Sequence, residues 1–264
     1  MKGNARVAVL GPEGTFTESA AREIYPSAEI VYCSNEAEVF DSVSDGKTEY
    51  GVVAIENSLE GSVAKTMACL LSYDVYIVAE IVLDINLCLI SNSDSDEIDK
   101  IMSHPHALDQ SANFIKENYP KAVRVSSAST AAAVRDIADE VRASAIGPKY
   151  AAVRYGLKVI RENVQDEPSQ TRFIAISKKK SKGDKTSIIF AVKDRPGALY
   201  GILKIFADKN INLTKIESRP SRRKLGEYLF FMDFENRGMS WNEVDGILKE
   251  VEHHTTLLKD LGSY

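Results

Sequence analysis

The chain has 264 residues, of which 44% are hydrophobic and 27% charged, a balance typical of globular proteins with one to three domains. The formal net charge is −5, and acidic and basic residues are interspersed, so no basic surface for nucleic acid is indicated. No window approaches the roughly 18 consecutive apolar residues of a membrane span. The N-terminus runs directly into a predicted strand, with no signal peptide expected.

The first two thirds of the chain alternate short apolar strands with amphipathic helices, which is an α/β pattern. Two similar α/β lobes are the simplest interpretation. The pattern predicts strands at 6–11, 29–33 and 50–56 with helices at 17–24 and 36–43, a strand-rich segment at 74–91, and strands at 100–105, 122–127 and 143–148 with helices at 108–119, 129–141 and 150–157.

A basic run at 178–185 separates this body from the C-terminal segment and is predicted to be a linker. The strand–helix–strand–strand–helix–strand order that follows is the ferredoxin-like pattern. We therefore predict a two-lobed body at 1–177 and a small domain at 186–264. Within that domain we expect strands at 186–192, 211–218, 228–235 and 255–261, helices at 200–209 and 241–254, and turns at 194–199 and 220–227.

Cysteine and histidine residues indicate neither a disulfide framework nor a metal site. Cys33, Cys69 and Cys88 are odd in number, far apart and without a C-x-x-C pair, which favours reduced thiols in a cytoplasmic protein. His104 and His106 could place two rings on one side of an extended segment, but a metal site needs further ligands. We predict no metal.

The segment GPEGTFTESAA, residues 11–21, follows the first strand and opens the first helix. Its glycines allow a tight turn, and the amides of a helix start, here around Gly14 and Thr15, can bind carboxylate or phosphate. The spacing matches neither the dinucleotide fingerprint nor the P-loop. The alternative is an ordinary helix start, with Thr15 or Thr17 as the capping residue.

Polar residues recur at the ends of predicted strands. Because the carboxyl ends of parallel strands share an edge, two lobes can enclose a cleft there. Such a cleft would suit a small anion, and no G-x-S-x-G elbow or catalytic cysteine signature accompanies it. The residues concerned are Glu56, Asn57 and Ser58 after one strand, Gly61 and Ser62 at the start of the next helix, His104 in 103–108, Ser129 and Thr130 in 126–133, and Thr171, Arg172 and Phe173.

Taken in chain order, these motifs resemble those of the prephenate dehydratase family, followed by an ACT regulatory domain. The resemblance covers nearly the whole chain. It implies a two-lobed, periplasmic-binding-protein-like α/β body and a ferredoxin-like βαββαβ ACT domain. The motifs are GPEGTFTESAA, ENSLEGSV, SHPHALDQ, the pair Ser129-Thr130, AIGPKYAAVRYGL and TRFIAI in the body, and RPGALYGIL and IESRP in the C-terminal domain.

The resemblance implies a carbon–oxygen lyase of L-phenylalanine biosynthesis that converts prephenate to phenylpyruvate without a cofactor. Thr171 would be the catalytic hydroxyl, and since threonine is a very weak acid, we expect it to donate a hydrogen bond or relay a proton. The implied catalytic residues are Thr171, Arg172, Phe173, Glu56 and Ser129. The implied substrate-binding residues are Gly14, Thr15, Asn57, Ser58, Gly61, Ser62, His104 and Thr130.

Several of these residues have an ordinary structural alternative. Glu56 could be a helix-cap acid, His104 a hydrogen-bonded structural histidine and Phe173 part of the core. Arg172 could bind a substrate carboxylate or hold Asp166 instead. The chain also departs from the family at two positions, where Ser169 stands for a frequent Asn and His106 for a frequent Gln.

For the C-terminal domain, the resemblance implies L-phenylalanine as an allosteric effector that gives feedback inhibition. The site would lie at a subunit interface of a homodimer or homotetramer with paired ACT domains. Helix-start amides suit the effector's carboxylate, and Glu217 could meet its ammonium. The implied residues are Arg195, Pro196, Gly197, Ala198, Leu199, Glu217, Ser218, Arg219 and Pro220.

Two other functions remain open from the residues alone. Arogenate, which carries an ammonium where prephenate has a keto oxygen, is a possible substrate, and an additional acidic group in the cleft would favour it. A non-catalytic amino-acid-binding sensor is the other alternative, since two lobes around a cleft also describe binding proteins.

Overall fold

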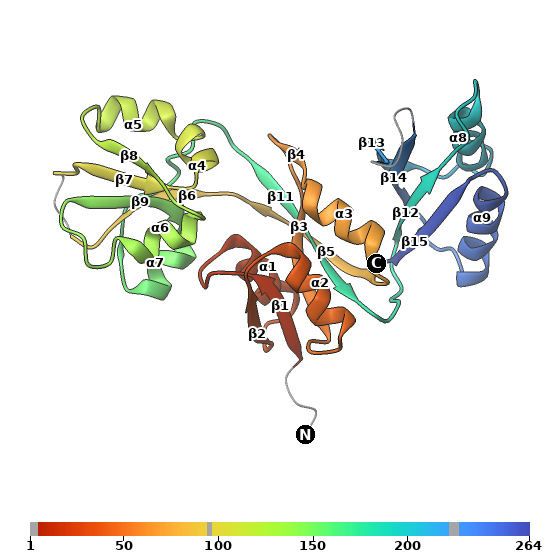
Figure 1. Ribbon diagram of the computed structural model, residues 1–264, viewed down its shortest axis with the longest axis horizontal. Helices are drawn as coiled ribbons and strands as arrows, with labels where there is room; N and C mark the ends of the chain where they lie inside the picture. Colours follow the sequence, from red (N-terminus) through yellow and green to blue (C-terminus); the bar gives the residue numbers. More distant parts are fainter. Residues whose placement is uncertain (1–4, 94–96, 222–226) are drawn as a thin grey trace. The chain divides into compact units, whose positions relative to one another are not determined.

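The computed structural model describes residues 5–93, 97–221 and 227–264 (Figure 1). Most of the turn predicted at 220–227 therefore lies outside the described residues. The chain forms two compact units. The first contains the residues up to Met67 and Ile81–Ala175, and the second contains Ala68–Glu80 and Ile176–Tyr264.

The first lobe is a six-stranded sheet with the order β2-β1-β3-β11-β5, and β4 pairs with β3. β1 runs parallel to both of its neighbours. Val7, Ala8 and Val9 are fully buried, as expected for a central strand of a parallel sheet that is covered on both faces. The strands are β1 (Arg6–Leu10), β2 (Glu29–Cys33), β3 (Tyr50–Asn57), β4 (Gly61–Ser62), β5 (Tyr76–Asp84) and β11 (Gln170–Ser177).

Three helices belong to this sheet: α1 (Phe16–Ile24), α2 (Glu36–Ser44) and α3 (Ala64–Ser72). Thr15, not Thr17, caps α1, because its hydroxyl accepts a hydrogen bond from the amide of Glu18 at 3.2 Å. α3 begins later than predicted. Its predicted first residues, Gly61 and Ser62, instead form β4, which pairs antiparallel with the end of β3.

The second lobe is a five-stranded mixed sheet with the order β10-β6-β9-β7-β8. β7 runs parallel to β8 and β9, whereas β6 and β9 are antiparallel. The strands are β6 (Leu87–Ser91), β7 (Lys100–Ser103), β8 (Val123–Ser126), β9 (Ala143–Pro148) and β10 (Lys158–Arg161).

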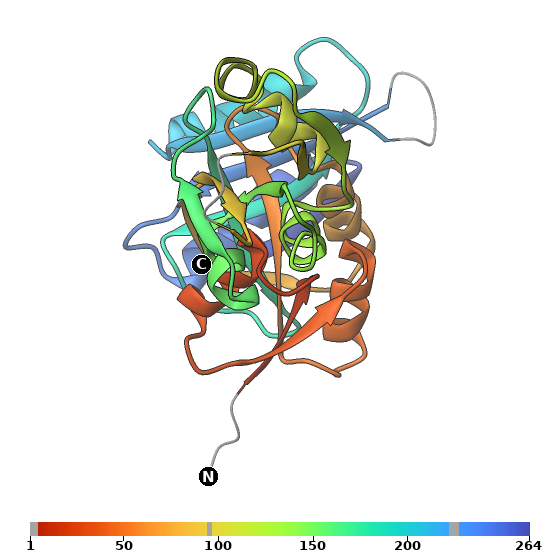
Figure 2. The ribbon, with the colours of Figure 1, turned by 90° about the vertical axis from the view of Figure 1, so that its left-hand side faces the viewer.

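Four helices cover the second sheet: α4 (Pro105–Asp109), α5 (Ala112–Asn118), α6 (Thr130–Asp136) and α7 (Lys149–Tyr155). Figures 1 and 2 show α4 and α5 on one side of the sheet and α6 and α7 on the other, and each pair packs on its own apolar cluster. The single helix predicted at 108–119 is thus wrong. The carboxylate of Asp166 binds the amides of Asn113 and Phe114 and caps a separate helix.

The helix predicted at 129–141 ends early, at Asp136. Beyond it, the amides of Ala138 and Glu140 bond to carbonyls three residues back, at Arg135 and Ile137, as in turns. The α-helix therefore ends before the segment 137–141 that the sequence suggested would continue it.

The C-terminal domain is a four-stranded antiparallel sheet with the order β13-β14-β12-β15. Its two helices lie on the same side of the sheet (Figure 1), where Ile202, Phe206 and Val251 pack against Ile188 and Phe234. This confirms the predicted βαββαβ order. The elements are β12 (Lys185–Ala191), α8 (Ala198–Asp208), β13 (Leu213–Pro220), β14 (Tyr228–Glu235), α9 (Trp241–His253) and β15 (Leu257–Ser263).

Candidate functional site

The candidate site lies at the edge of the first sheet where β3 ends beside the start of β11. The amide of Ser58 donates to the carbonyl of Gln170 at 2.8 Å, and the amide of Gln170 donates to the hydroxyl of Ser58 at 2.9 Å. The two strands therefore run in opposite directions. Thr171 stands at the beginning of its strand, and antiparallel pairing, not a shared carboxyl end, brings it to the same edge as Asn57.

Thr171 and Asn57 form a direct hydrogen bond at this edge. The side-chain amide of Asn57 donates to the Thr171 hydroxyl oxygen at 2.9 Å, and Thr171 is only 8% exposed. The other end of the Asn57 amide, Oδ1, accepts from the backbone amides of Leu59 and Glu60 at 2.9 and 3.1 Å. Because these donors fix the orientation of the amide, the Thr171 oxygen is an acceptor from Asn57. Its own hydrogen is available to a second acceptor.

Glu56 and Arg172 lie opposite each other on the same two strands. Arg172 Nη1 is 3.8 Å from Glu56 Oε2, and the arginine side chain is 12% exposed. Because side chains alternate along strands, this pair faces away from Asn57 and Thr171. Asp166, the alternative partner considered for Arg172, instead caps α5.

Phe173 is 2% exposed and belongs to the buried core. By the same alternation, it shares a face of β11 with Thr171. Phe173 therefore occupies a core position, which was the structural alternative to a catalytic role. The hydroxyl of Thr171 lies at the outer end of the same face.

The turn at 11–15 is already satisfied by its own helix. Gly14 has φ of +90°, and a Cβ there would lie 3.1 Å from Ala151, so glycine is required. The amide of Gly14 donates to Glu18 Oε2 at 2.8 Å. The amide that the sequence suggested for anion binding is thus occupied by a carboxylate.

Glu18 was not predicted and is the most buried acid of this region, with an exposed fraction of 0%. Besides Gly14, it accepts from Arg22 Nε and from the Tyr150 hydroxyl, both at 2.9 Å. Burial raises the pKa of the Tyr150 hydroxyl, which therefore remains a donor. The available signal was the Thr-x-x-Glu spacing of Thr15 and Glu18, which is typical of a capping box.

His104, the N-cap residue of α4, and His106 within that helix lie together. The rings of His104 and His106 are stacked with centroids 5.0 Å apart, and His106 Nδ1 contacts the carboxylate of Glu60. Burial lowers the pKa of His104, and the neighbouring His106 lowers it further, so the neutral form is favoured. Glu60 follows the turn that Asn57 organises, so this contact joins the two lobes of the first unit.

Two cavities of about 450 Å³ each adjoin this region. Four carboxylates line the first cavity. The second is lined in part by Ser58 and by Ser169, one of the two positions at which the chain departs from the family pattern. The first is lined by Leu59, Glu60, His106, Asp109, Gln110, Asn113, Asp166 and Glu167. The second is lined by Ser58, Asp84, Asn86, Pro168, Ser169 and Gln170.

Ser129 and Thr130 lie in the second lobe. The hydroxyl of Ser129 caps α6 by accepting from the amide of Ala132 at 3.0 Å, and Thr130 is the first residue of the helix. The structure thus brings together Asn57, Ser58 and Thr171 most directly, whereas Ser129 and Thr130 serve first as a local helix start.

In the C-terminal domain, Gly197 has φ of +80° and precedes α8, while Arg195 and Pro196 beside it are exposed. The carboxylate of Glu217 lies 3.4 Å from Lys215 Nζ and 3.7 Å from Arg219 Nε. Ala198 and Leu199 begin α8, and Ser218 and Pro220 complete β13.

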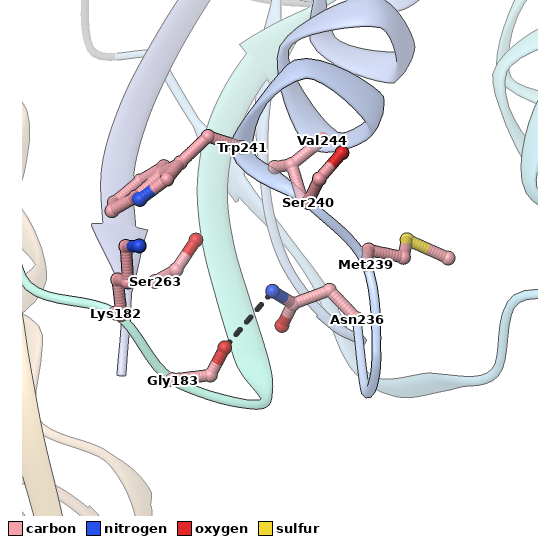
Figure 3. Close-up of a pocket in the computed structure, with 8 residues that line it drawn as sticks. All are labelled: Lys182, Gly183, Asn236, Met239, Ser240, Trp241, Val244 and Ser263. Atoms are coloured by element: carbon pink, nitrogen blue, oxygen red, sulfur yellow. Dashed lines mark hydrogen bonds between the residues drawn. The ribbon is translucent and has the colours of Figure 1, made fainter.

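A cavity of about 170 Å³ lies elsewhere in this domain (Figure 3). The ammonium of Lys182 is 5.9 Å from the Trp241 ring centroid, and Asn236 Nδ2 donates to the carbonyl of Gly183 at 3.0 Å. Gly183 precedes β12 and Arg195 follows it, so this cavity and the predicted effector residues lie at opposite ends of the sheet. Its lining is Lys182, Gly183, Asn236, Met239, Ser240, Trp241, Val244 and Ser263.

Within residues 5–93, 97–221 and 227–264, no three histidine, cysteine or acidic side chains are grouped so that they could hold a metal ion. In the same ranges, no helix combines the length and apolarity needed to cross a membrane.

The fold defines a two-lobed α/β protein with a polar edge on its first sheet, followed by a ferredoxin-like domain. A family model for prephenate dehydratase matches residues 7–181, and a model for the ACT domain matches 186–239. The prephenate dehydratase of Methanocaldococcus jannaschii is 43% identical over 277 residues, covering 99% of this chain and 98% of the relative. The chain belongs to the prephenate dehydratase family and carries an ACT domain.

Solved structures agree with this assignment. A prephenate dehydratase from Arthrobacter aurescens, in complex with L-Phe, has a TM-score of 0.88 at 30% identity, covering 97% of this chain and 89% of that one. GqqA, described as a novel type of quorum quenching acylase, has a TM-score of 0.86 at 28% identity, covering 97% and 96%. The family fold thus accompanies more than one named activity.

Proposed function

We propose that this protein is a prephenate dehydratase, a carbon–oxygen lyase that converts prephenate to phenylpyruvate, carbon dioxide and water. The observation that carries this proposal is the Asn57–Thr171 hydrogen bond, which directs the Thr171 hydrogen to another acceptor. The relatives named prephenate dehydratase over almost the whole chain support it.

The reaction needs help at the departing hydroxyl. As the ring carboxylate leaves as carbon dioxide, its bonding electron pair enters the ring and expels the hydroxyl from the opposite carbon, and one proton completes water. Thr171 would donate its hydrogen bond to that oxygen as negative charge develops on it. A preoriented donor of this kind is worth about 10²- to 10³-fold in rate.

The positions of the remaining predicted residues suggest a more specific role for each of them. Gly61 and Ser62 would hold the end of β3 through β4, and Ser58 would hold the start of β11. Arg172, paired with Glu56 across the two strands, would hold the strand ends in place, and its guanidinium would favour the binding of an anion. Ser129, Thr130 and His104 would complete substrate binding from the second lobe, with Thr15 shaping the first turn.

We also propose that L-phenylalanine regulates the enzyme through the ACT domain, at residues 195–199 and 217–220. The relative crystallised with L-Phe supports this effector. β13, which carries Glu217, is an edge strand of its sheet and can therefore pair across an interface, in keeping with a homodimer or homotetramer.

We propose that the catalytic domain spans 1–177, the linker 178–185 and the ACT domain 186–264. The proposed compartment is the cytoplasm, in keeping with the free thiols of Cys33, Cys69 and Cys88.

One observation favours arogenate as a second candidate substrate. The cavity next to the Asn57 turn carries the carboxylates of Glu60, Asp109, Asp166 and Glu167, and the ammonium of arogenate would be attracted to them. An acylase is less well supported, because nucleophilic acyl transfer needs a base beside the hydroxyl and the partner of Thr171 is the Asn57 amide.

The test is to incubate the purified chain with prephenate at neutral pH and follow phenylpyruvate formation, with arogenate assayed in parallel. Replacing Thr171 with alanine should lower kcat by about 10²-fold or more. Thr256→Ala, an exposed threonine in the ACT domain, is the matched control and should retain wild-type turnover. If Thr171→Ala is as fast as the wild type, the hydroxyl has no catalytic role. A higher kcat/KM for arogenate would reassign the substrate.

A further inference from the structure

The segment Leu71–Glu80, which spans the end of α3 and the first half of β5, is held by the C-terminal part of the chain. Lys259 of β15 donates to the carbonyl of Leu71 at 3.1 Å and to that of Tyr73. The hydroxyl of Ser181 donates to the carbonyl of Val78 at 3.2 Å, and Lys185 contacts the carboxylate of Glu80. These contacts all lie within the second compact unit.

Lys259 makes two of these contacts, both to backbone carbonyls. Its ammonium meets carbonyls at the end of α3, where the last carbonyls of a helix have no partner inside the helix and attract a cation. Lys259 is half-buried, and this burial lowers the pKa of its ammonium. Removing the ammonium would leave the part-buried carbonyl of Leu71 without this donor, while the carbonyl of Tyr73 keeps the backbone amide of Val75 at 3.1 Å.

The other ends of α3 and β5 lie at the candidate active site. α3 follows β4, which pairs with Glu56 and Asn57, and the hydroxyl of Thr66 in α3 donates to the carbonyl of Ala54 in β3 at 2.7 Å. β5 ends at Asp84, which accepts from the side chain of Gln170, the neighbour of Thr171, at 2.8 Å.

We propose that Lys259 is a positioning residue that links the ACT domain to the Asn57–Thr171 edge through α3 and β5. At the segment Leu71–Glu80, β15 meets both elements. Lys259 binds the end of α3, and Gly262 lies so close to β5 that a Cβ there would be 2.9 Å from the carbonyl oxygen of Ile77. A change in the ACT domain that shifts β15 would move the end of α3 and the start of β5, and with them the two strands that carry the hydrogen bond. This inference rests on the proposed regulation by phenylalanine, and an effector acts in this way only if it binds the two arrangements with different affinity.

The test uses the full-length Lys259→Met variant, which removes the ammonium and keeps a long apolar stem. Lys249→Met, on the exposed face of α9 where the lysine pairs with Asp245, is the matched control. Phenylalanine binding is measured by calorimetry and turnover of prephenate is measured with and without phenylalanine. Coupling between allosteric sites is typically about 5- to 150-fold. We expect it to fall below about twofold in Lys259→Met, with phenylalanine still bound, and to persist in the control.

A second readout does not depend on the effector. Amide hydrogen exchange should increase at 57–62 and 170–173 in Lys259→Met, remain unchanged in Lys249→Met and be restored in Lys259→Arg, which keeps a cation. Full inhibition of Lys259→Met by phenylalanine, or unchanged exchange at both segments, would overturn the proposal. If the wild type binds phenylalanine without losing turnover, the proposed regulation fails, and the exchange result alone decides the positioning role.

Discussion

Replacing Asn57 with aspartate reverses the hydrogen bond that orients Thr171. The substitution keeps the size of the side chain and the oxygen that accepts from Leu59 and Glu60, but the atom 2.9 Å from Thr171 becomes an acceptor. The Thr171 hydroxyl must then donate to residue 57 and is lost to the substrate. Losing one oriented donor costs about 10²- to 10³-fold in kcat, or about 2.7–4 kcal/mol.

The free energy of unfolding should change by less than about 1 kcal/mol, because the two backbone amides keep an acceptor, now charged. Turnover of prephenate is measured at pH 7, about 3 units above the usual aspartate pKa, so that residue 57 stays ionised. Asn242→Asp, on an exposed position in the first turn of α9, controls for the added charge. A kcat within about threefold of the wild type for Asn57→Asp would refute the orientation argument.

Two further predictions concern stability. Glu18→Gln should lower the free energy of unfolding by about 1–3 kcal/mol in urea titration, because in either orientation its amide nitrogen faces a donor, Gly14 on one side or Arg22 and Tyr150 on the other. An unchanged midpoint would show that this buried cluster is dispensable. The pKa of His104 is lowered in the folded state, so below about pH 6.5 the unfolded chain binds more protons than the folded chain. The free energy of unfolding therefore falls as the pH drops. His104→Gln should therefore lose less stability than the wild type between pH 7.5 and 5, and equal losses would contradict this.

Local patterns predicted most of the strands and helices, because periodicity and capping are properties of neighbouring residues. Examples are the βαββαβ order of the C-terminal domain and the capping role of Thr15, which was predicted as one of two alternatives with Thr17. The helix predicted at 108–119 failed because its break is made by Asp166, 53 residues away from the amide of Asn113. The local signal is weak, since the chain around residue 110 has neither proline nor glycine, and Ser111 at the N-cap position makes no side-chain capping hydrogen bond.

The sequence named the residues of the candidate site but did not predict their geometry. Asn57 and Thr171 were both singled out, yet they are 114 positions apart, and their hydrogen bond depends on β11 returning antiparallel to β3. Strand direction is set by how the chain returns from the second lobe, which motif spacing does not encode. Glu18 was missed for a related reason, since its partner Tyr150 comes from the other lobe.

The departure at His106 affects the mouth of the site more than the hydroxyl. The chain of hydrogen bonds from the amides of Leu59 and Glu60 through Asn57 to Thr171 contains no group that titrates near neutral pH. Its orientation should therefore be independent of pH around neutrality. His106 contacts the carboxylate of Glu60, whose backbone amide, not its side chain, holds Asn57. A different residue at position 106 can thus alter how the lobes meet without reorienting Thr171.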